Sequence, residues 1–257
     1  MLNFKNTNLF FAAVIVLILA ADYFFEISLW IYYLPVMIYV LILFYGSYFI
    51  HSNFYLPIIC NGITDKNEIA LTFDDGPNKK NTLLILDVLK QNNLSATFFC
   101  IGKKIKENPL PLKRIDDEGH LVGNHSYSHH YWFDLFSTRK MIEELKATDE
   151  MAEKIIHKKL NLFRPPYGVT NPNLAKAIKQ GKYIPIGWSV RTMDTTIKDE
   201  KILLQNITCN IKQGDIFLFH DTQDITAKFL QSFINNVKQQ GFEIVRLDKL
   251  LKLEAYE

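Results

Sequence analysis

Two long apolar stretches at the start of the chain constrain its fold more than any other feature. Every residue from 9 to 21 is apolar, and no charged residue occurs between 29 and 45. A helix needs about 20 apolar residues to cross the hydrocarbon core of a bilayer, with a range of about 17–25. We therefore predict two transmembrane helices, at about 8–25 and 28–50, joined by a short acidic turn near Glu26. Residues 1–55 would then form a membrane anchor, followed by a short polar linker after Ile50.

A signal peptide followed by a single anchor is the alternative to this hairpin. Lys5 is the only basic residue before the first stretch, and Ala20-Ala21 makes a poor cleavage site. The same lack of basic residues leaves little for the positive-inside rule to count. Lys5 by itself places the N-terminus in the cytoplasm, and two spans would return the rest of the chain to that side.

Composition excludes several functions for the remaining part, which we expect to form one domain over 61–257. The net charge of the 257-residue chain is only +2, so we expect no nucleic-acid partner. The three cysteines, Cys60, Cys100 and Cys209, lie far apart and form no C-x-x-C pair. A zinc-finger or disulfide framework is therefore not expected.

Apolar strand-like runs alternate with helical patterns from about residue 61 onward. The predicted strands cover 69–73, 96–101, 120–123, 162–164, 183–190, 215–219 and 242–245. The predicted helices cover 82–91, 112–117, 138–157, 172–179, 201–211 and 225–238. This alternation predicts an α/β fold with a parallel sheet, either open or closed into a barrel. In both cases the functional residues are expected on the loops that follow the carboxyl ends of the strands.

Polar and aromatic residues follow five of the predicted strands. They are Asp74 and Asp75 after the first, His125 and His129 after the third, Arg164 to Gly168 after the fourth, Trp188, Arg191 and Asp194 in and after the fifth, and His220 and Asp221 after the sixth. The carboxyl ends of parallel strands meet at one edge, so this distribution predicts a single active site there.

The residue types at these strand ends indicate metal-dependent hydrolysis. His125 and His129 stand four apart, so one helical turn would bring both imidazoles to the same face. With one carboxylate they would form an Asp-His-His site with open positions for water and substrate. Adjacent strand residues point to opposite faces, so Asp74 and Asp75 can take different roles. One would bind the metal, which lowers the pKa of bound water to roughly 7, while the other accepts the proton.

Each of these signals is weak when taken alone. Two acids before a Gly-Pro turn are often a helix cap or a solvated turn, and histidine-rich turns are often solvated. Arg164 could be a structural ion-pair partner, and Tyr167 and Trp188 could be core aromatics. Their joint occurrence at strand ends favours the active site, with His220 available as general acid for the leaving group.

At this point the chain resembles the polysaccharide deacetylases with a NodB-homology domain, carbohydrate esterase family 4. The resemblance covers about 66–250 and matches five motifs in the family's order, at 72–77, 125–129, 164–168, 188–194 and 218–220. It implies a distorted (β/α)7 barrel, here preceded by the predicted transmembrane helical hairpin. In the fourth motif Arg191 stands where the family often has an acid, whereas Asp194 fits the motif's second acid.

The resemblance also implies a role for each matching residue. Asp74 corresponds to the catalytic base and His220 to the general acid, while Asp75, His125 and His129 correspond to the ligands of a divalent metal, usually zinc. The supporting residues are Arg164, which orients the base, Pro166 and Tyr167 in the groove wall, Leu218 in the pocket for the acetyl methyl group, and Trp188 and Asp194 in the fourth motif. The backbone at Tyr167 is expected to stabilise the oxyanion.

The implied activity is that of a carbohydrate N-deacetylase, which hydrolyses carbon–nitrogen amide bonds. It would remove N-acetyl or N-formyl groups from amino sugars of a polysaccharide, peptidoglycan or lipid-linked glycan. The alternative is a membrane-anchored glycan-binding homologue with impaired catalysis. Because such glycans lie outside the cytoplasmic membrane, we predict a multi-pass protein whose catalytic domain is extracytoplasmic, although Lys5 favours the opposite orientation.

Overall fold

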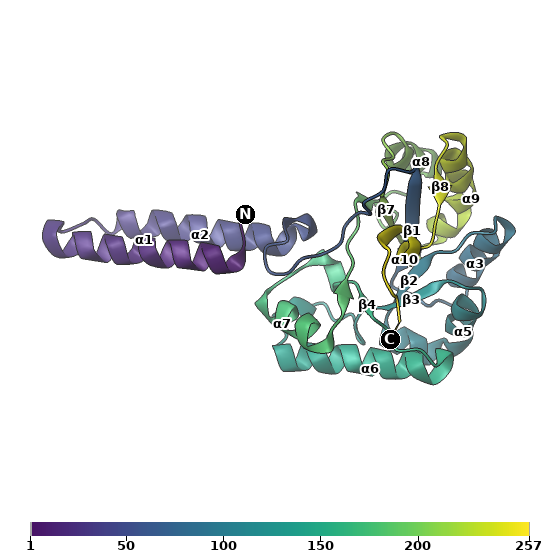
Figure 1. The fold of residues 1–257 in the computed structure, drawn as a ribbon, viewed down its shortest axis with the longest axis horizontal. Coiled ribbons are helices and arrows are strands. Elements are labelled where there is room, and N and C mark those ends of the chain that lie inside the picture. The colour runs from purple at the N-terminus through teal and green to yellow at the C-terminus, as the bar shows by residue number, and fades with distance from the viewer. Residues whose placement is uncertain (1, 257) are drawn as a thin grey trace.

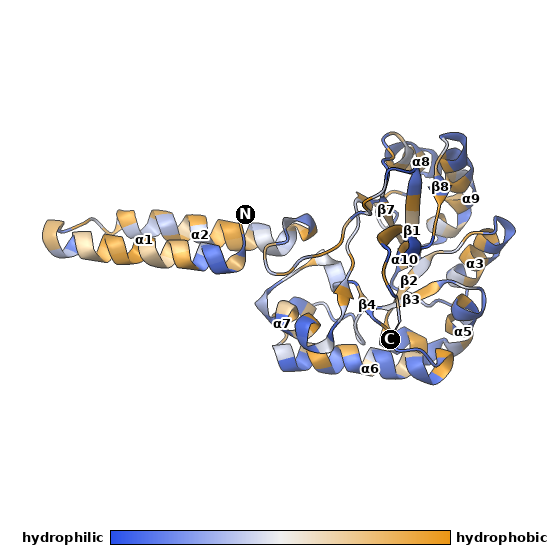
Figure 2. Cartoon of the chain, in the orientation of Figure 1, coloured by the Kyte–Doolittle hydropathy of each residue, from blue (hydrophilic) through white to orange (hydrophobic). Residues whose placement is uncertain are grey.

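The computed structural model describes residues 2–256 as a helical hairpin that projects from one side of an α/β domain (Figure 1). Helices α1 (Phe4–Phe25) and α2 (Trp30–Tyr48) form the hairpin. Both are long and apolar enough to cross a membrane, and almost none of their residues is buried inside the protein. Figure 2 shows that most residues of both helices are apolar, with hydrophilic residues near the start of α1. A helix that is apolar on all sides needs apolar surroundings to be stable.

Several polar side chains of the hairpin are paired within it, although the buried Thr7 hydroxyl has no hydrogen-bond partner. The turn is closed by Asp22, whose Oδ1 accepts from the backbone N–H of Ile27 at 2.6 Å and whose Oδ2 accepts from the Tyr32 hydroxyl at 3.1 Å. Farther from the turn, the Tyr39 hydroxyl of α2 donates to Asn8 Oδ1 of α1 at 2.9 Å. Such internal pairing is required of polar groups in a segment that lipid surrounds.

The segment after the hairpin is not the polar linker predicted from the sequence. It begins with η1 (Ile50–Ser52), bends at residues 54–56 and continues to residue 60. Its alternate residues Phe54, Leu56, Ile58 and Cys60 are all buried, so the segment packs into the domain along its length. The α/β domain therefore includes this segment.

The α/β domain is built on one curled parallel sheet. Its strands are β1 (Glu68–Asp74), β2 (Thr97–Cys100), β3 (Leu121–Asn124), β4 (Leu162–Phe163), β5 (Ile184–Pro185), β6 (Val190–Arg191), β7 (Ile216–His220) and β8 (Glu243–Ile244). Their order is β5-β4-β3-β2-β1-β7-β6, and β8 pairs with the start of β1. The predicted (β/α)7 fold is confirmed: the curled sheet forms a half-barrel covered by helices.

The predicted strand 183–190 is wrong as a single element. Its first part is β5, which pairs with β4, and its last part is β6, which pairs with β7 at the opposite edge of the sheet. Between them, Gly187 passes so close to Cys60 that a Cβ at this position would lie 2.6 Å from the Cys60 Sγ. The chain crosses between the two edges here, which interrupts strand pairing.

The helices of the domain cover the outside of the sheet (Figure 1). They are α3 (Asn81–Gln91), α4 (Gly102–Glu107), α5 (Pro109–Asp117), α6 (Thr138–Ile156), α7 (Pro172–Gly181), α8 (Glu200–Thr208), α9 (Asp224–Gln239) and α10 (Leu247–Leu251), with short turns η2 (Phe133–Leu135) and η3 (Pro166–Gly168). All six predicted helices are present, whereas α4 and α10 were not predicted. The core includes Phe73, stacked on Phe98 at 5.0 Å and on Phe219 at 5.5 Å between ring centroids.

Candidate active site

The carboxyl ends of the strands surround a cavity of about 200 Å³. It is lined by Asp74, Asp75, His125, His129, Pro165, Tyr167, Gly168, Trp188, Arg191, Thr195, Leu218 and His220. Eight of the residues predicted for the site are therefore brought together. Arg164 and Asp194 lie behind this surface, fully buried, and Pro166 is buried in η3 while its neighbour Pro165 lines the cavity.

The two aspartates face the same cavity, although adjacent strand residues were expected to face opposite sides. Asp74 is the last residue of β1, whereas Asp75 lies beyond the strand with a left-handed backbone conformation, φ 74°. This turn redirects its side chain. The loop is held by Lys104, whose Nζ donates to the Asp75 carbonyl at 2.7 Å. A glycine must follow, because a Cβ on Gly76 would lie 2.0 Å from Asp221 Oδ2.

The two histidines lie on an irregular loop and not on the predicted helical turn. The loop follows β3, and Ser126 and His129 adopt positive φ values of 61° and 46°. Glu144 of α6 anchors it, because its Oε2 accepts from both the backbone N–H and the hydroxyl of Ser128 at 2.8 Å. Both histidines reach the cavity, but the loop conformation brings them there and not the helical spacing from which the pair was predicted.

Asp75, His125 and His129 form a cluster with the donor atoms of a metal site. Asp75 Oδ1 lies 3.4 Å from His129 Nε2 and 3.6 Å from His125 Nε2. One ligand atom from each residue lies within 4.8 Å of the others. His125 Nδ1 lies 2.8 Å from the carbonyl oxygen of Arg164, so Nδ1 carries the proton and the Nε2 lone pair faces Asp75. The donor set and its orientation fit a divalent transition metal.

The ionisation of this cluster suits metal binding. Burial, together with the nearby His125, lowers the pKa of His129 to about 4, so its imidazole is neutral at neutral pH. Burial by itself would raise the pKa of Asp75, but His125 and His129 outweigh it and the pKa is lowered. A neutral imidazole at His129 and an ionised carboxylate at Asp75 are the forms that bind a metal.

Asp74 is held by a fully buried arginine. Nη1 of Arg164 donates to Asp74 Oδ1 at 2.8 Å and to Thr72 Oγ1 at 2.7 Å. Its other nitrogens donate to the carbonyl oxygens of Ile186 and Gly187 at 3.3 and 2.6 Å. Oδ1 is thereby fixed, while Oδ2 lies 3.9 Å from His125 Nε2 beside the metal-ligand cluster.

His220 is oriented by Asp194. The Nδ1 of His220 lies 2.7 Å from Asp194 Oδ1, and its backbone N–H donates to Asp194 Oδ2 at 2.7 Å. The Thr226 hydroxyl donates to the same Oδ2 at 2.6 Å. Burial would lower the pKa of His220, but the hydrogen bond and charge of Asp194 outweigh it and the pKa is raised. Asp194 thus supplies the acidic partner, while Arg191 is exposed at the rim of the cavity.

Replacement of this buried aspartate should change the pH dependence of turnover. A general acid must be protonated, so activity is lost as the pH rises through the pKa of His220. Because Asp194 raises that pKa, Asp194→Asn should move the alkaline limb of the kcat profile to lower pH. The measurement is kcat against pH for both proteins, with Asp199→Asn, at an exposed helix cap, as the control. An unchanged alkaline limb would contradict the assigned pairing.

Aromatic residues form the walls of the cavity. Tyr167 has a left-handed backbone, φ 59°, and its ring centroid lies 4.6 Å from that of His129. Trp188 packs on Gly168, where a Cβ would lie 2.5 Å from the Trp188 Cη2. Leu218 is buried beneath the cavity and contributes apolar lining. Tyr167, Trp188 and Leu218 thus give the cavity apolar lining beside its polar residues.

Some supporting residues were not predicted from the sequence. Glu144 could have been found in the sequence, because it is a charged residue on the helix face that Met141, Leu145 and Thr148 define as buried along α6. The sequence gives no such signal for Lys104 and Thr226, because lysine and threonine are common on helices. Their roles depend on which loop each helix meets in the folded chain.

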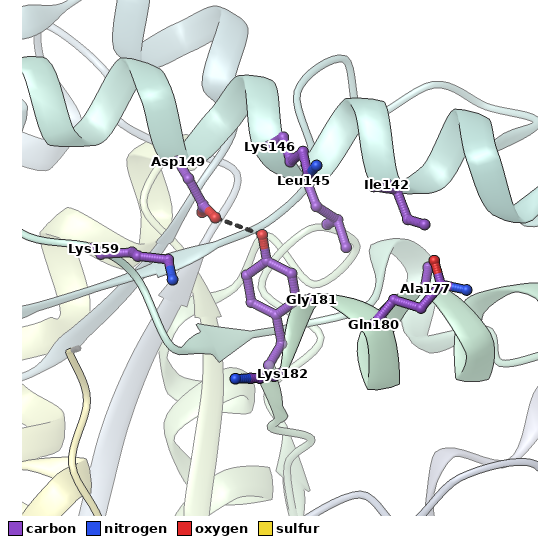
Figure 3. Close-up of a pocket in the computed structure, with 10 residues that line it drawn as sticks. Ile142, Leu145, Lys146, Asp149, Lys159, Ala177, Gln180, Gly181 and Lys182 are labelled. Carbon is purple, nitrogen blue, oxygen red and sulfur yellow. Dashed lines mark hydrogen bonds between the residues drawn. The ribbon is translucent and has the colours of Figure 1, made fainter.

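A second cavity, of about 370 Å³, lies between α6 and α7 and contains none of the predicted site residues (Figure 3). Asp149 lies at its wall, where Oδ2 accepts from the Tyr183 hydroxyl at 2.5 Å and Oδ1 accepts from Asn124 Nδ2 at 2.8 Å. Burial raises the pKa of Asp149 to about 6. Asn124 is the residue before His125, so this group supports the start of the histidine loop.

Comparisons with known proteins agree with this site. The family model for polysaccharide deacetylase matches residues 61–185. The peptidoglycan-N-acetylmuramic acid deacetylase PdaA of Bacillus subtilis is 36% identical over 205 residues, which are 78% of this chain and 76% of that protein. The peptidoglycan-N-acetylglucosamine deacetylase PgdA of Listeria monocytogenes is 35% identical over 207 residues, 79% of this chain but only 42% of PgdA. The chain thus spans less than half the length of PgdA.

Solved structures share both fold and sequence with this chain. The Bc1960 peptidoglycan N-acetylglucosamine deacetylase, in complex with an N-hydroxybenzamide compound, superposes with a TM-score of 0.74 at 30% identity, covering 78% of this chain and 95% of that one. BA3943, a CE4 family pseudoenzyme from Bacillus anthracis, superposes with a TM-score of 0.71 at 30% identity, covering 76% of this chain and 68% of that one. On the identity and coverage of these relatives, the chain belongs to the polysaccharide deacetylase family, carbohydrate esterase family 4.

Proposed function

We propose that the chain is a membrane-anchored, metal-dependent deacetylase that hydrolyses the acetamide group of an N-acetylated amino sugar in peptidoglycan or a related glycan. One observation carries this proposal. The Asp75, His125 and His129 cluster shares a cavity with Asp74, which Arg164 holds, and with His220, which Asp194 holds. A metal site, a base and an acid in one cavity are the groups that amide hydrolysis requires.

The metal would be held by Asp75, His125 and His129. Deacetylases of this family are metal-dependent, and two imidazoles with one carboxylate suit zinc, which we propose as the ion. When bound, a zinc ion would polarise the amide carbonyl and make water a stronger acid. Among the described residues, this cluster has no cysteine and no third histidine.

The protons would be moved by Asp74 and His220. Asp74 Oδ2, the oxygen that Arg164 leaves free, would accept a proton from the water that attacks the carbonyl carbon. His220, whose pKa Asp194 raises, would in its protonated form donate a proton to the amine nitrogen as the carbon–nitrogen bond breaks. The products are acetate and a free amino sugar, and no other reactant is needed. Leu218 and Trp188 would contact the acetyl methyl group.

An impaired, glycan-binding homologue is the second candidate. It is favoured by the similarity to BA3943, a pseudoenzyme of the same family, and by Arg191 in place of an acid in the fourth motif. The complete set of base, acid and metal-ligating side chains, and the pairing of His220 with Asp194, argue for activity.

Acetate release from a panel of substrates should separate the two candidates. The full chain in detergent would be incubated with chitooligosaccharides, peptidoglycan and a lipid-linked amino sugar, and acetate and formate would be assayed. We expect acetate from at least one substrate. Binding of a glycan without release of either acid would support the impaired homologue. Whether acetate or formate is released also shows whether the group removed is N-acetyl or N-formyl.

We further propose that α1 and α2 both cross the membrane and that the anchor ends at residue 49, not at the predicted residue 55, because the segment from Ile50 onward packs into the domain. Aromatic residues gather at both ends of the hairpin, as in the belts at membrane interfaces. The start of α1 is also part of the domain junction, where the Phe4 backbone N–H donates to the Phe54 carbonyl at 3.0 Å. A cleaved signal peptide would not be expected to make such a contact.

The domain is proposed to face the extracytoplasmic side, where peptidoglycan lies. The relatives named above act on peptidoglycan, and this choice outweighs the single charge of Lys5. Alkaline phosphatase fused to the C-terminus should be active in intact cells. A fluorescent C-terminal fusion that matures only in the cytoplasm should stay dark, and its fluorescence would place the domain inside.

A further inference from the structure

The end of the hairpin is hydrogen-bonded directly to the loop that forms one wall of the catalytic cavity. Thr170 follows η3 by two residues, and its backbone N–H donates to the Ser47 carbonyl of α2 at 3.1 Å. Its hydroxyl donates to the Gly46 carbonyl at 3.0 Å. Tyr167 lies three residues earlier and lines the cavity. The cavity wall and the end of α2 are therefore parts of one structure.

The junction is packed as well as hydrogen-bonded. Phe54 lies against α2, so closely that a Cβ on Gly46 would be 2.2 Å from the Phe54 Cδ1. The ring of Phe4 in α1 contacts Tyr55, with 5.1 Å between centroids, and the Tyr55 hydroxyl donates to the Leu43 carbonyl at 3.2 Å. Both helices contact the segment that enters the domain core. The domain is thereby held at the end of the hairpin in one orientation.

An exposed apolar loop lies next to this junction. Tyr131, Trp132 and Leu135 are 70%, 54% and 70% exposed, which is unusual for three large apolar side chains within five residues. The loop is fixed to the segment that follows the cavity wall, because Asn171 Nδ2 donates to the Asp134 carbonyl at 2.6 Å. The ring centroids of Tyr131 and Tyr167 are 6.3 Å apart. The apolar loop thus borders the cavity on the side where the hairpin meets the domain.

The composition of this surface matches a bilayer interface. Tyrosine and tryptophan are enriched where lipid tails meet head groups, and basic residues bind anionic head groups. Arg139 and Lys140, both exposed, follow the loop in the first turn of α6. Glu143 pairs with Arg139, at 3.1 Å, on the solvent side. A sugar platform would need aromatic faces, but it would not need the exposed aliphatic Leu135.

We propose that the loop formed by residues 131–135 enters the surface of the bilayer and holds the mouth of the catalytic cavity at the membrane plane. The substrate would then be an N-acetylated glycan that is tethered to the membrane by a lipid. This inference rests on the proposed membrane hairpin and deacetylase activity. The partner of the loop itself is the lipid surface, whichever glycan is attached to it.

The depth of the loop can be measured without any assay of activity. Leu135→Cys in a Cys209→Ser background would carry a polarity-sensitive dye, because Cys60 and Cys100 are buried. The full chain would be placed in vesicles of phosphatidylethanolamine and phosphatidylglycerol that contain a lipid with a spin label near the head group. The control is Leu110→Cys, equally exposed at 77%, in α5 on the side of the domain away from the hairpin (Figure 1).

We expect a blue-shifted, strongly quenched dye at position 135 and an unshifted, unquenched dye at position 110. Equal exposure of the two dyes to water would overturn the proposal. The result does not depend on catalysis, so an inactive protein would still give it. The failure of the proposed enzyme function would therefore be distinguished from the failure of this inference.

Kinetics test whether the same surface contacts sugar instead. The double variant Trp132→Ser with Leu135→Ser should raise KM for a lipid-linked amino sugar in vesicles by about tenfold or more, as expected from removing two apolar side chains from an apolar phase. KM for a soluble chitooligosaccharide should stay the same. An equal loss on both substrates would show that the loop binds the glycan, and would overturn the proposal. Leu110→Ser is the matched control.

Discussion

The Asp74→Asn variant is expected to release acetate about 10²–10⁴-fold more slowly than the wild type, because it lacks the general base. Its bound zinc should be nearly unchanged, since the cluster that would hold the ion consists of Asp75, His125 and His129. The neutral amide keeps the size of the carboxylate and can still contact Arg164. Turnover and metal content, measured on the same preparation, separate loss of the base from loss of the ion.

The neighbouring Asp75→Asn variant is the matched control for this experiment. It makes the same chemical change one residue along the chain, at a carboxylate whose Oδ1 lies 3.4 Å from His129 Nε2. Metal content should fall together with activity in this protein. Equal loss of metal from both variants would show that the two aspartates do not divide the roles of base and ligand.

The second large effect concerns stability. Arg164→Met should lower the free energy of unfolding by about 3–5 kcal/mol, the usual cost of removing one partner from a buried ion pair. Arg164 is fully buried, and its loss would leave Asp74 charged without a partner and the carbonyls of Ile186 and Gly187 without their donor. Denaturant unfolding of the two proteins, followed by the fluorescence of the domain, gives the difference.

The double variant Arg164→Met with Asp74→Asn tests the reason for this effect. Removing the charge of Asp74 should restore part of the lost stability, because less desolvated charge then remains unpaired. Arg139→Met removes an arginine whose ion pair is exposed, and it should change stability by less than about 1 kcal/mol. A small effect of Arg164→Met, similar to that of Arg139→Met, would mean that the buried pair does not stabilise the fold.

The active-site residues could be predicted because strand ends are readable in the sequence. Apolar runs end at Asp74 and before His125 and His220, and parallel strands bring these points to one edge of the sheet. The family motifs then assigned a role to each residue. Neither signal depends on the detailed path of the loops, which is why the predicted residues lie together around one cavity although the helical turn at 125–129 was wrong.

Features that depend on contacts between distant segments could not be predicted. The stretch 183–190 has strand-like residues throughout, yet it pairs with β4 first and with β7 later, so its break reflects the closure of the sheet. The acidic partner of His220 was undecided because the family's fourth motif has two acids, and Arg191 stands at the position of the first while Asp194 fits the second. Only the fold shows that Asp194 is buried against the imidazole while Arg191 points to the exposed rim.

The role of residues 50–60 was hidden for a similar reason. Their apolar positions alternate, but the sequence of one short segment does not show which part of the domain it will pack against. In the structure Ile59 pairs with Ile186, and Ile58 and Cys60 enter the core beside α7. The boundary between anchor and domain therefore moved toward the hairpin once the packing was known.

The most direct test of the proposed metal-dependent deacetylase is a zinc titration of the full chain with the substrate that the panel identifies. The metal would be removed with a chelator and restored in measured amounts, and acetate release and bound zinc would be determined in the same samples. We predict that the rate rises in proportion to occupancy and reaches its maximum at one ion per chain, as a single Asp-His-His cluster requires. A rate that does not change when the metal is removed would contradict the account.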